Sequence, residues 1–358
     1  MANSGKHIFF LAPYPKGAAP SQRFRFEQYL DYLKEQGFNY SFHPFYDQKA
    51  WETLYAQGKT GVKLFHLLRS FMRRTLLMFQ LHRADYIFVH REMSHVGPPI
   101  FEWITTKVLR KKFIYDFDDA IWLPNYSEQN AKFQKLKMYK KVFRIMRWAN
   151  QVTAGNTFLC KKAREFNPHV QFLPTTIDLH YHTAEAKKEG KLTIGWTGSH
   201  TTAKYLHDLV PVIQELNNKY DFDFLVISNE NPGLDLPNLK YIPWEKNSEI
   251  KDLNLIDIGI MPLEDSVWTH GKCAFKILQY MALSKACVAS PVGANLTVIK
   301  EGENALFAQS EKEWYDALEK LIFDENLRYE LGENAFETVK NHYSVVANRE
   351  KYLSLFQK

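Results

Sequence analysis

Three carboxylates lie close together in the segment FIYDFDDAIW, where Asp116, Asp118 and Asp119 come at the end of an expected strand, Lys112–Phe117. Like charges at this spacing repel one another and are costly unless water or a ligand compensates them. Open α/β sheets bind ligands beyond the carboxyl ends of their strands, where this cluster would lie. The cluster could stabilise positive charge or orient a hydroxyl group, and the structural alternative is a helix cap or an interdomain contact.

A second candidate site begins where an expected strand, Lys191–Thr197, runs into Gly198 and Ser199. Glycine lets the backbone approach a ligand closely, and the helix expected from about Thr202 offers free N–H groups at its start. Lys204 lies in the first turn of that helix. The pattern suits a diphosphate, although a plain strand–turn–helix junction with a surface lysine would have the same residues.

A third candidate site lies in the segment THGKCAFKILQYMALSKACVASPVG, where His270 precedes an expected helix. Lys272, Lys276 and Gln279 are spaced i, i+4 and i+7, so one helix over Lys272–Leu283 would bring them onto one face. Two cations and an amide on one face could hold a nucleotide diphosphate and its ribose. A solvated basic stripe is the alternative. His90 lies at the end of another expected strand, Asp85–His90, and could likewise have a functional or a structural role.

Strand and helix patterns alternate through both halves of the chain. This alternation predicts βαβ units and parallel sheets, hence two doubly wound α/β domains. In the first half a helix over Arg23–Gln36 would end at Gly37, and in the second half a helix is expected over Ala203–Asn218. The predicted domains are residues 1–179 and 191–340, joined by the polar segment 180–190 and followed by a C-terminal helix, 341–358, that returns to the first domain. The expected strands are His7–Pro13, Asn39–Phe45, Asp85–His90, Lys112–Phe117, Gln151–Ala154, Val170–Leu173, Lys191–Thr197, Asp223–Ser228, Leu239–Trp244, Ile256–Leu263, Ala286–Ser290 and Ala305–Ala308.

The composition narrows the class of protein. With 358 residues the chain is long enough for two domains, and its net charge of +6 suits an anionic small molecule or an anionic membrane surface but gives no sign of nucleic-acid binding. Its three cysteines have no CxxC spacing, which predicts neither a zinc site nor disulfides and favours a reducing compartment. No signal peptide and no apolar run of spanning length is found. We therefore expect a cytoplasmic protein.

Two basic amphipathic segments could place the protein on the inner face of a membrane. The first carries an apolar stripe of Leu64, Leu68, Phe71, Met72, Leu76 and Phe79, with Arg69, Arg73 and Arg74 beside it. The second, Lys132–Arg147, has seven basic residues and no acidic one. The alternative is that each stripe packs on a sheet and the charges are solvated.

The motifs together resemble those of bacterial family-4 glycosyltransferases, which have the GT-B fold of two Rossmann-like domains facing each other across a cleft. The likeness runs in order over residues 7–350. Its segments are PSQRFRFEQYL, REMSHVGPPIFEW, IYDFDDAIWLPN, AGNTFL, IGWTGSHTTAKYL, DIGIMPLEDSVW and GKCAFKILQYMALSKACVASPVGANLTVIKEGENALF.

The resemblance assigns donor binding to the second half of the chain. Gly198 and Lys204 match the family's glycine and diphosphate-contacting lysine, and Lys276 matches a second phosphate-contacting lysine. Ser199 stands where the family has arginine, and the family's glutamate pair is replaced by Gly271 and Gln279. His270 and Lys272 belong to the same donor segment. The backbone near Trp244 could meet the base, since Trp244 ends an expected strand beside the same site.

The resemblance assigns the acceptor side to the first half of the chain. Gly17 and Ser21 match a loop that approaches donor and acceptor, Arg23 and Arg25 could bind an anionic acceptor, and His90 faces the cleft. Asp118 falls at the position of a catalytic-site histidine, with Asp116 and Asp119 beside it. An Asp-x-Asp metal–diphosphate motif, as in the other large glycosyltransferase fold, is a further alternative.

The implied function is transfer of a sugar from a UDP- or GDP-linked donor to a glycan or lipid-linked acceptor, with retained configuration, without a metal or cofactor, in cell-surface polysaccharide or glycolipid synthesis. Two other functions stay open. One is a phosphohydrolase that uses Asp116 and Asp118. The other is a sugar-nucleotide-binding protein that has lost catalysis.

Overall fold

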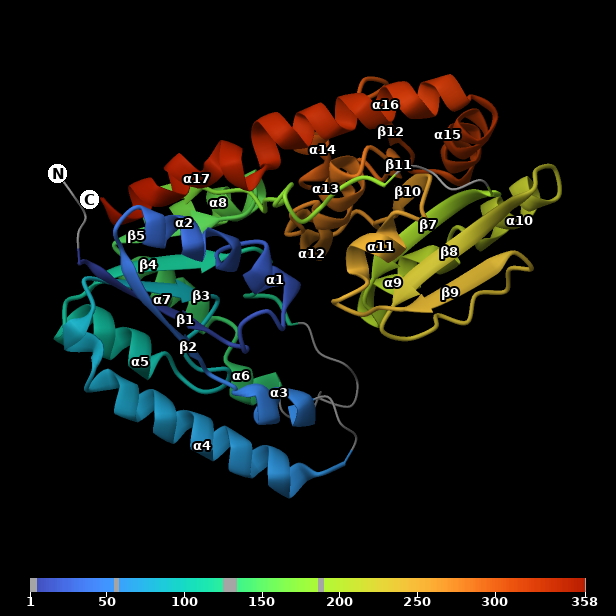
Figure 1. Ribbon diagram of the computed structural model, residues 1–358. Coiled ribbons are helices and arrows are strands. Elements are labelled where there is room, and N and C mark those ends of the chain that lie inside the picture. Colours follow the sequence, from blue (N-terminus) through green and yellow to red (C-terminus); the bar gives the residue numbers. More distant parts are fainter. Residues whose placement is uncertain (1–4, 55–57, 125–133, 186–189, 358) are drawn as a thin grey trace. The chain divides into compact units, whose positions relative to one another are not determined.

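The computed structural model describes residues 5–54, 58–124, 134–185 and 190–357 (Figure 1). The chain folds into two compact units. Unit 1 comprises Met1–Thr175 and Arg349–Lys358, and unit 2 comprises Thr176–Asn348. The linker expected at 180–190 includes residues 186–189, which lie outside the described residues.

Unit 1 is built on a six-stranded sheet whose order is β2-β1-β3-β4-β5-β6, with every neighbouring pair parallel. Strands β3 and β4 are buried along nearly their whole length, as continuous apolar runs between two helix layers require. Helix α2 lies on one face of the sheet and α4 and α5 on the other (Figure 1). The strands are β1 (His7–Ala12), β2 (Asn39–Pro44), β3 (Tyr86–His90), β4 (Lys112–Phe117), β5 (Gln151–Ala154) and β6 (Val170–Phe172).

The helices of unit 1 are mostly short, and α4 is much the longest. The helix expected at Arg23–Gln36 is interrupted, because the backbone leaves helical geometry at Phe24 and Phe26. Arg25 and Phe26 are both buried at this break. The helices are α1 (Pro20–Arg23), η1 (Glu27–Tyr29), α2 (Leu30–Glu35), α3 (Gln48–Leu54), α4 (Thr60–Met78), η2 (Leu81–Arg83), α5 (Ile100–Trp103), η3 (Ile104–Val108), α6 (Gln134–Lys137), α7 (Lys141–Trp148) and α8 (Thr157–Arg164).

The end of the chain completes the core of unit 1. Helix α17 (Val345–Leu353) leads into η6 (Ser354–Phe356). Tyr352 stacks on Tyr29 with ring centroids 4.2 Å apart. Phe356 is fully buried, and its ring contacts those of Phe10 and Phe88.

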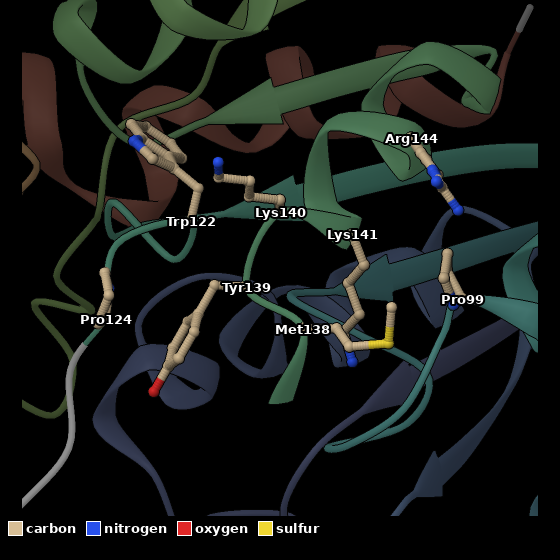
Figure 2. A pocket seen from close by; sticks show the side chains of 8 residues that line it. All are labelled: Pro99, Trp122, Pro124, Met138, Tyr139, Lys140, Lys141 and Arg144. Carbon is tan, nitrogen blue, oxygen red and sulfur yellow. The ribbon is translucent and has the colours of Figure 1, made fainter. Parts of the chain in front are cut away.

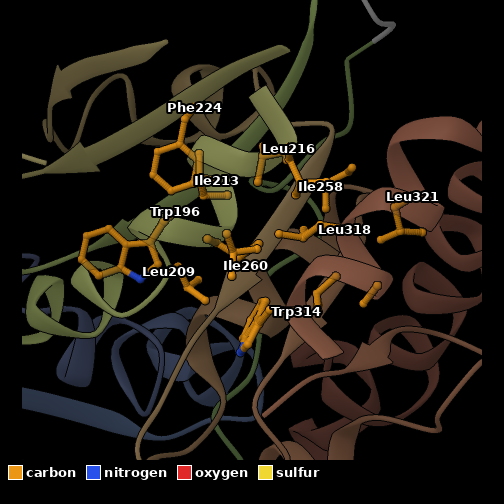
Figure 3. Close-up of a cluster of buried hydrophobic side chains, with 14 of the residues drawn as sticks. Trp196, Leu209, Ile213, Leu216, Phe224, Ile258, Ile260, Trp314, Leu318 and Leu321 are labelled. Carbon is orange, nitrogen blue, oxygen red and sulfur yellow. The ribbon is translucent and has the colours of Figure 1, made fainter. Parts of the chain in front are cut away.

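Unit 2 has a second six-stranded parallel sheet, in the order β12-β11-β10-β7-β8-β9. Both sheets confirm the predicted class of doubly wound α/β domains. The core beside this sheet includes Trp196, Ile213, Ile260 and Trp314 (Figure 3). The strands are β7 (Leu192–Gly198), β8 (Phe222–Ser228), β9 (Leu239–Pro243), β10 (Ile258–Met261), β11 (Ala286–Ala289) and β12 (Leu306–Phe307).

One helix expected in unit 2 is split, since α9 ends at His207 and α10 begins at Val210. Pro211, in the first turn of α10, has no N–H to continue the α9 ladder, and in one continuous helix its ring would clash with the carbonyl four residues earlier. The helices are α9 (His200–His207), α10 (Val210–Asn217), α11 (Glu249–Leu253), α12 (Val267–His270), α13 (Phe275–Ala282), α14 (Asn295–Val298), α15 (Glu311–Phe323), α16 (Glu325–Thr338) and η5 (Val339–Tyr343).

Close packing of a helix on the sheet fixes α13. A Cβ atom on Gly259 of β10 would lie 2.4 Å from the ring of Tyr280. The Tyr280 hydroxyl accepts a hydrogen bond of 2.8 Å from the backbone N–H of Thr197 at the end of β7. This contact ties α13 to the edge of the sheet where β7 runs into Gly198.

Candidate functional site

Gly198 and Lys276, 78 residues apart in the sequence, come together in unit 2. A Cβ atom at position 198 would lie 2.7 Å from Cε of Lys276 and 2.5 Å from the Trp196 ring. The Lys276 ammonium lies 5.5 Å from the centroid of that ring. Glycine is therefore required at 198 for the lysine stem to cross the end of β7.

Helix α13 carries Lys276 in its first turn, and the N–H groups of a first turn have no acceptor within the helix itself. The helix begins at Phe275, because Ala274 adopts a left-handed conformation with φ of 55°. The expectation that Lys272, Lys276 and Gln279 share one helical face is therefore wrong for Lys272. Lys272 lies in the turn after α12, with its ammonium 4.5 Å from the Trp268 ring centroid.

Gln279 lies on the buried side of α13 and is only 2% exposed. Its amide donates a hydrogen bond of 3.3 Å to Glu249 of α11, which is 3% exposed. Sequence reasoning missed Glu249, because it lies in another element with no motif around it. The amide that stands in place of a glutamate thus has a carboxylate partner from elsewhere in the fold.

Lys204 extends from α9 into solvent and pairs with Glu264 at 3.4 Å. The Tyr205 hydroxyl donates to the same carboxylate oxygen at 3.2 Å. Burial and this carboxylate raise the pKa of Tyr205. Glu264 follows β10, the neighbour of β7, so Lys204 and Lys276 flank the same edge of the sheet from different elements.

The loop before α13 is held by short contacts. A capping box between Ser266 and Thr269 starts α12, and His270 pairs with Asp265 at 2.6 Å. Gly293 has φ of 58°, and a Cβ atom there would lie 3.0 Å from the backbone at Thr269 and His270.

The remaining donor candidates border this edge of unit 2. Ser199 is the N-cap residue of α9, and its hydroxyl lies 2.8 Å from that of Thr201. Half-buried Trp244 follows β9, and its backbone N–H donates to the Ser228 carbonyl at 3.0 Å. Both residues therefore follow strand ends of the same sheet.

Unit 1 has a buried ionic network at the end of β4. Asp116 is fully buried, pairs with the Arg25 guanidinium, and accepts from His90 Nδ1 at 2.8 Å and from Thr153 Oγ1 at 2.6 Å. Burial alone would raise the pKa of Asp116, but Arg25 and His90 hold it well below its usual range. Arg25 also donates to the Leu173 carbonyl. Arg25 lies inside the unit, not on a helix surface.

Asp118 and Asp119, in contrast, are partly exposed and share the guanidinium of Arg91. Arg91 donates to Asp118 at 2.7 and 3.0 Å and to Asp119 at 2.9 Å. Its pKa is raised, because these carboxylates outweigh the effect of burial. Arg91 has φ of 62°, a conformation that a non-glycine side chain adopts only when its surroundings enforce it.

His90 connects the two groups of carboxylates. Its Nδ1 is bound to Asp116, and its Nε2 lies 3.9 Å from Asp118 without a hydrogen-bond partner among the described residues. An imidazole held at one nitrogen and directed at a carboxylate with the other is suited to positioning or proton transfer.

The loop after β1 turns at Gly17, which has φ of 78° and donates its N–H to Glu27 at 2.7 Å. Ser21 and Arg23 are partly exposed at α1. Buried Gln22 contacts the Tyr14 backbone in both directions and donates to Glu27, which fixes the loop against the break after α1.

A cavity of about 420 Å³ lies in unit 1, close in sequence to the acidic cluster (Figure 2). Lys141 lies beneath it and is neutralised by Glu92 at 3.0 Å. Apolar and aromatic side chains line the cavity together with three cations, Lys140, Lys141 and Arg144 (Figure 2). The lining residues are Pro99, Trp122, Pro124, Met138, Tyr139, Lys140, Lys141 and Arg144.

Comparisons with known proteins agree with this geometry. Residues 191–324, the segment that carries Gly198, Lys204 and Lys276, match the model of the family described as glycosyl transferases group 1. No curated protein sequence matches the chain.

Solved structures resemble the chain over almost its whole length. A glycosyltransferase from Rickettsia africae has a TM-score of 0.68 at 15% identity, with 98% of each chain covered. Sucrose-phosphate synthase from Thermosynechococcus elongatus has a TM-score of 0.70 at 11% identity, with 98% of each chain covered. Anabaena HepE in complex with UDP and glucose has a TM-score of 0.65 at 12% identity, covering 97% of this chain and 98% of the other. The two α/β units thus have the GT-B fold, as predicted.

Proposed function

We propose that this protein is a glycosyltransferase that moves a sugar from a nucleotide-diphosphate donor to an acceptor hydroxyl. The observation that carries the proposal is the approach of Lys276 to Gly198 at the edge of the unit 2 sheet. A lysine in the first turn of a helix, beside a strand end with no side chain, suits the two negative charges of a diphosphate. The match of residues 191–324 to group 1 glycosyl transferases supports the same reading.

The donor site comprises Gly198, Ser199, Lys204 and Lys276 at the phosphates, with Gln279 and Glu249 toward the ribose. His270, Lys272 and Trp244 border the same site. The lysines neutralise the diphosphate as it leaves, which lowers the barrier to breaking its bond to the sugar without a metal ion. UDP-sugars are the first donors to test, because structurally similar HepE binds UDP and glucose.

The acceptor side is assigned to unit 1. Asp118 is the proposed catalytic carboxylate, with Asp119 and Arg91 fixing its position. Buried Asp116 positions His90, whose Nε2 lies 3.9 Å from Asp118. Gly17, Ser21 and Arg23 form the loop that would approach the acceptor, a glycan or a lipid-linked sugar. Retention of configuration and a role in surface polysaccharide or glycolipid synthesis belong to this proposal.

Donor binding is tested by thermal shift with UDP- and GDP-sugars, with and without EDTA. We expect one donor class to stabilise the wild type, and EDTA to leave the shift unchanged. Lys276→Ala should remove most of the shift, because the diphosphate loses the counter-charge next to Gly198. Lys312→Ala, an exposed lysine paired with Asp316 on α15, is the matched control and should retain the shift. An unchanged shift in Lys276→Ala would remove the donor-site assignment.

Transfer is tested with Asp118→Asn. This variant should keep the donor-induced shift and lose turnover by roughly a hundredfold, as expected for one electrostatic contact to the transition state. Donor binding without turnover in the wild type, over a panel of acceptors, would identify a binding protein instead. A phosphohydrolase that attacks through Asp116 is disfavoured, because this carboxylate is fully buried and has three partners.

A further inference from the structure

Helix α4 is apolar on the side that faces solvent as well as on its inner side, where Leu67 and Phe71 pack against the cluster of Phe45, Tyr46 and Ala50. Toward the interior it presents Ser70, Arg74 and Leu77, which are buried. Toward solvent it presents a stripe of apolar side chains, each between 55% and 74% exposed, which we call the α4 face. The α4 face consists of Leu64, Phe65, Leu68, Met72, Leu76 and Phe79.

The α4 face is continuous along the helix. Phe65, Leu68, Met72, Leu76 and Phe79 are separated by three, four, four and three residues, which aligns them on one side of a helix. No charged residue interrupts this side. Single exposed apolar residues are ordinary on proteins, but a stripe along about four turns indicates a surface that is covered by something apolar.

Positive charge flanks the α4 face. Between Thr53 and Ala84 the sequence has no Asp or Glu, and besides the buried Arg74 it has five basic residues: Lys59, Lys63, Arg69, Arg73 and Arg83. Arg69 and Arg73 are partly exposed and share one carboxylate, that of Asp47, at 2.9 and 3.1 Å. The surface around the stripe therefore keeps an excess of cations.

The positive charge beside the α4 face indicates which kind of partner covers it. Two α4 helices from two copies would bring like charges together beside the stripe, with no carboxylate on the helix to pair with them. A bilayer with anionic lipids supplies both an apolar layer for the stripe and negative charge for the cations. We propose that the α4 face docks the protein on an anionic membrane surface, with α4 lying in the interface.

The other basic segment considered from the sequence does not offer such a face. In α7, Val142, Ile145 and Met146 are buried, so its apolar side packs inside unit 1. Residues 132 and 133 of that segment lie outside the described residues. Helix α5 and its π-helical extension η3, beside α4 through the Phe71–Phe101 ring contact, do expose Ile100, Trp103 and Val108. Tryptophan is enriched at membrane interfaces.

Among the described residues no helix has the length and apolarity needed to cross a bilayer.

The test is vesicle flotation of the whole protein, without donor, so that its result is independent of the proposed transfer reaction. Vesicles contain phosphatidylcholine alone or phosphatidylcholine with phosphatidylglycerol. We expect the wild type to float with the anionic vesicles only, and less as the salt concentration rises. Replacing Leu68, Met72 and Leu76 together by Gln should lower the bound fraction by at least about tenfold, because these side chains would lie in the apolar layer.

The matched control replaces Leu255, Phe323 and Tyr329 by Gln, three exposed apolar side chains of unit 2, and should float like the wild type. Circular dichroism of each variant confirms that it is folded. Failure of the wild type to float, equal flotation with both vesicle types, or unchanged flotation of the α4 variant would overturn the proposal. A wild-type dimer that the α4 variant converts to a monomer, without flotation, would assign the face to a second copy.

Discussion

Single carboxylates in unit 1 differ in what neutralises them. Asp118 and Asp119 share Arg91 at a partly exposed position, whereas Asp116 and Glu92 are buried with their own cations, Arg25 and Lys141. A buried pair contributes little net stability when intact, but removing one partner leaves an uncompensated charge. Asp118 and Asp119 are thus the carboxylates of this group that solvent reaches in part, whereas each buried pair needs both of its partners.

Glu92 makes this difference measurable. Burial would raise its pKa, but Lys141 and His95 lower it from 4.5 to about 2. A carboxyl group whose pKa is lower in the folded state stabilises the protein above its unfolded pKa, and this stability is lost as pH falls toward the folded pKa. Unit 1 should therefore lose stability between about pH 4.5 and pH 2.

The variant Glu92→Gln should destabilise unit 1 by about 3 kcal/mol at neutral pH, since Lys141 stays buried without its partner. Urea unfolding at pH 7, followed by repeats at lower pH, measures both the loss and a shallower acid dependence. Adding Lys141→Met should restore part of the stability. If Glu92→Gln alone unfolds like the wild type at pH 7, loss of this carboxylate does not leave Lys141 as a costly buried charge.

Among the elements, the strands were the most predictable and the helix starts the least. A continuous apolar run such as that of β10 is readily predicted to be a buried strand, because a strand buried on both faces must be apolar throughout. The start of α13 depends on the left-handed backbone at Ala274, which no residue pattern nearby predicts. The prediction that Lys272 lies on this helix is therefore wrong. The break after α1 depends on the attraction between Arg25 and Asp116, 91 residues away.

The site was predictable to a similar degree. The lysines and the aspartates follow strand ends, where the topology of parallel sheets gathers ligand-binding residues. The sequence did not predict Arg91 and Glu249 as site residues, because their roles depend on contacts between distant elements. The sequence shows the apolar stripe of α4, but it does not show whether the stripe faces the core or solvent. The structure shows that it faces solvent, because Ser70, Arg74 and Leu77 lie on the buried side.

The position of α13 is an element-scale property that Gly259→Ala would test. The added methyl group would meet the Tyr280 ring at 2.4 Å, so α13 must shift and take Lys276 with it. We expect unit 2 to lose about 1–3 kcal/mol and donor binding to weaken. Gly190→Ala is the control, since nothing lies within 4 Å of a Cβ atom there. Calorimetry together with donor titration measures both effects, and wild-type behaviour of Gly259→Ala would contradict the packing argument.

For the molecule as a whole, two compact units imply two separable unfolding transitions. Phe356 is fully buried in unit 1, so Phe356→Ala should destabilise that unit by about 3–5 kcal/mol and leave the transition of unit 2 in place. Phe323→Ala, at a side chain 84% exposed in unit 2, should change neither transition by more than about 0.5 kcal/mol. Scanning calorimetry with a donor that binds unit 2 identifies which transition has moved.

Because the last residues of the chain belong to unit 1, they also determine the order in which the two units can fold during synthesis on the ribosome. Residues up to Thr175 emerge first, but they lack the rings of Tyr352 and Phe356, which fill their core. Unit 2 has all of its strands before these residues are made, so the half translated later can finish folding earlier. Throughout that interval the nascent first half displays an apolar surface to chaperones.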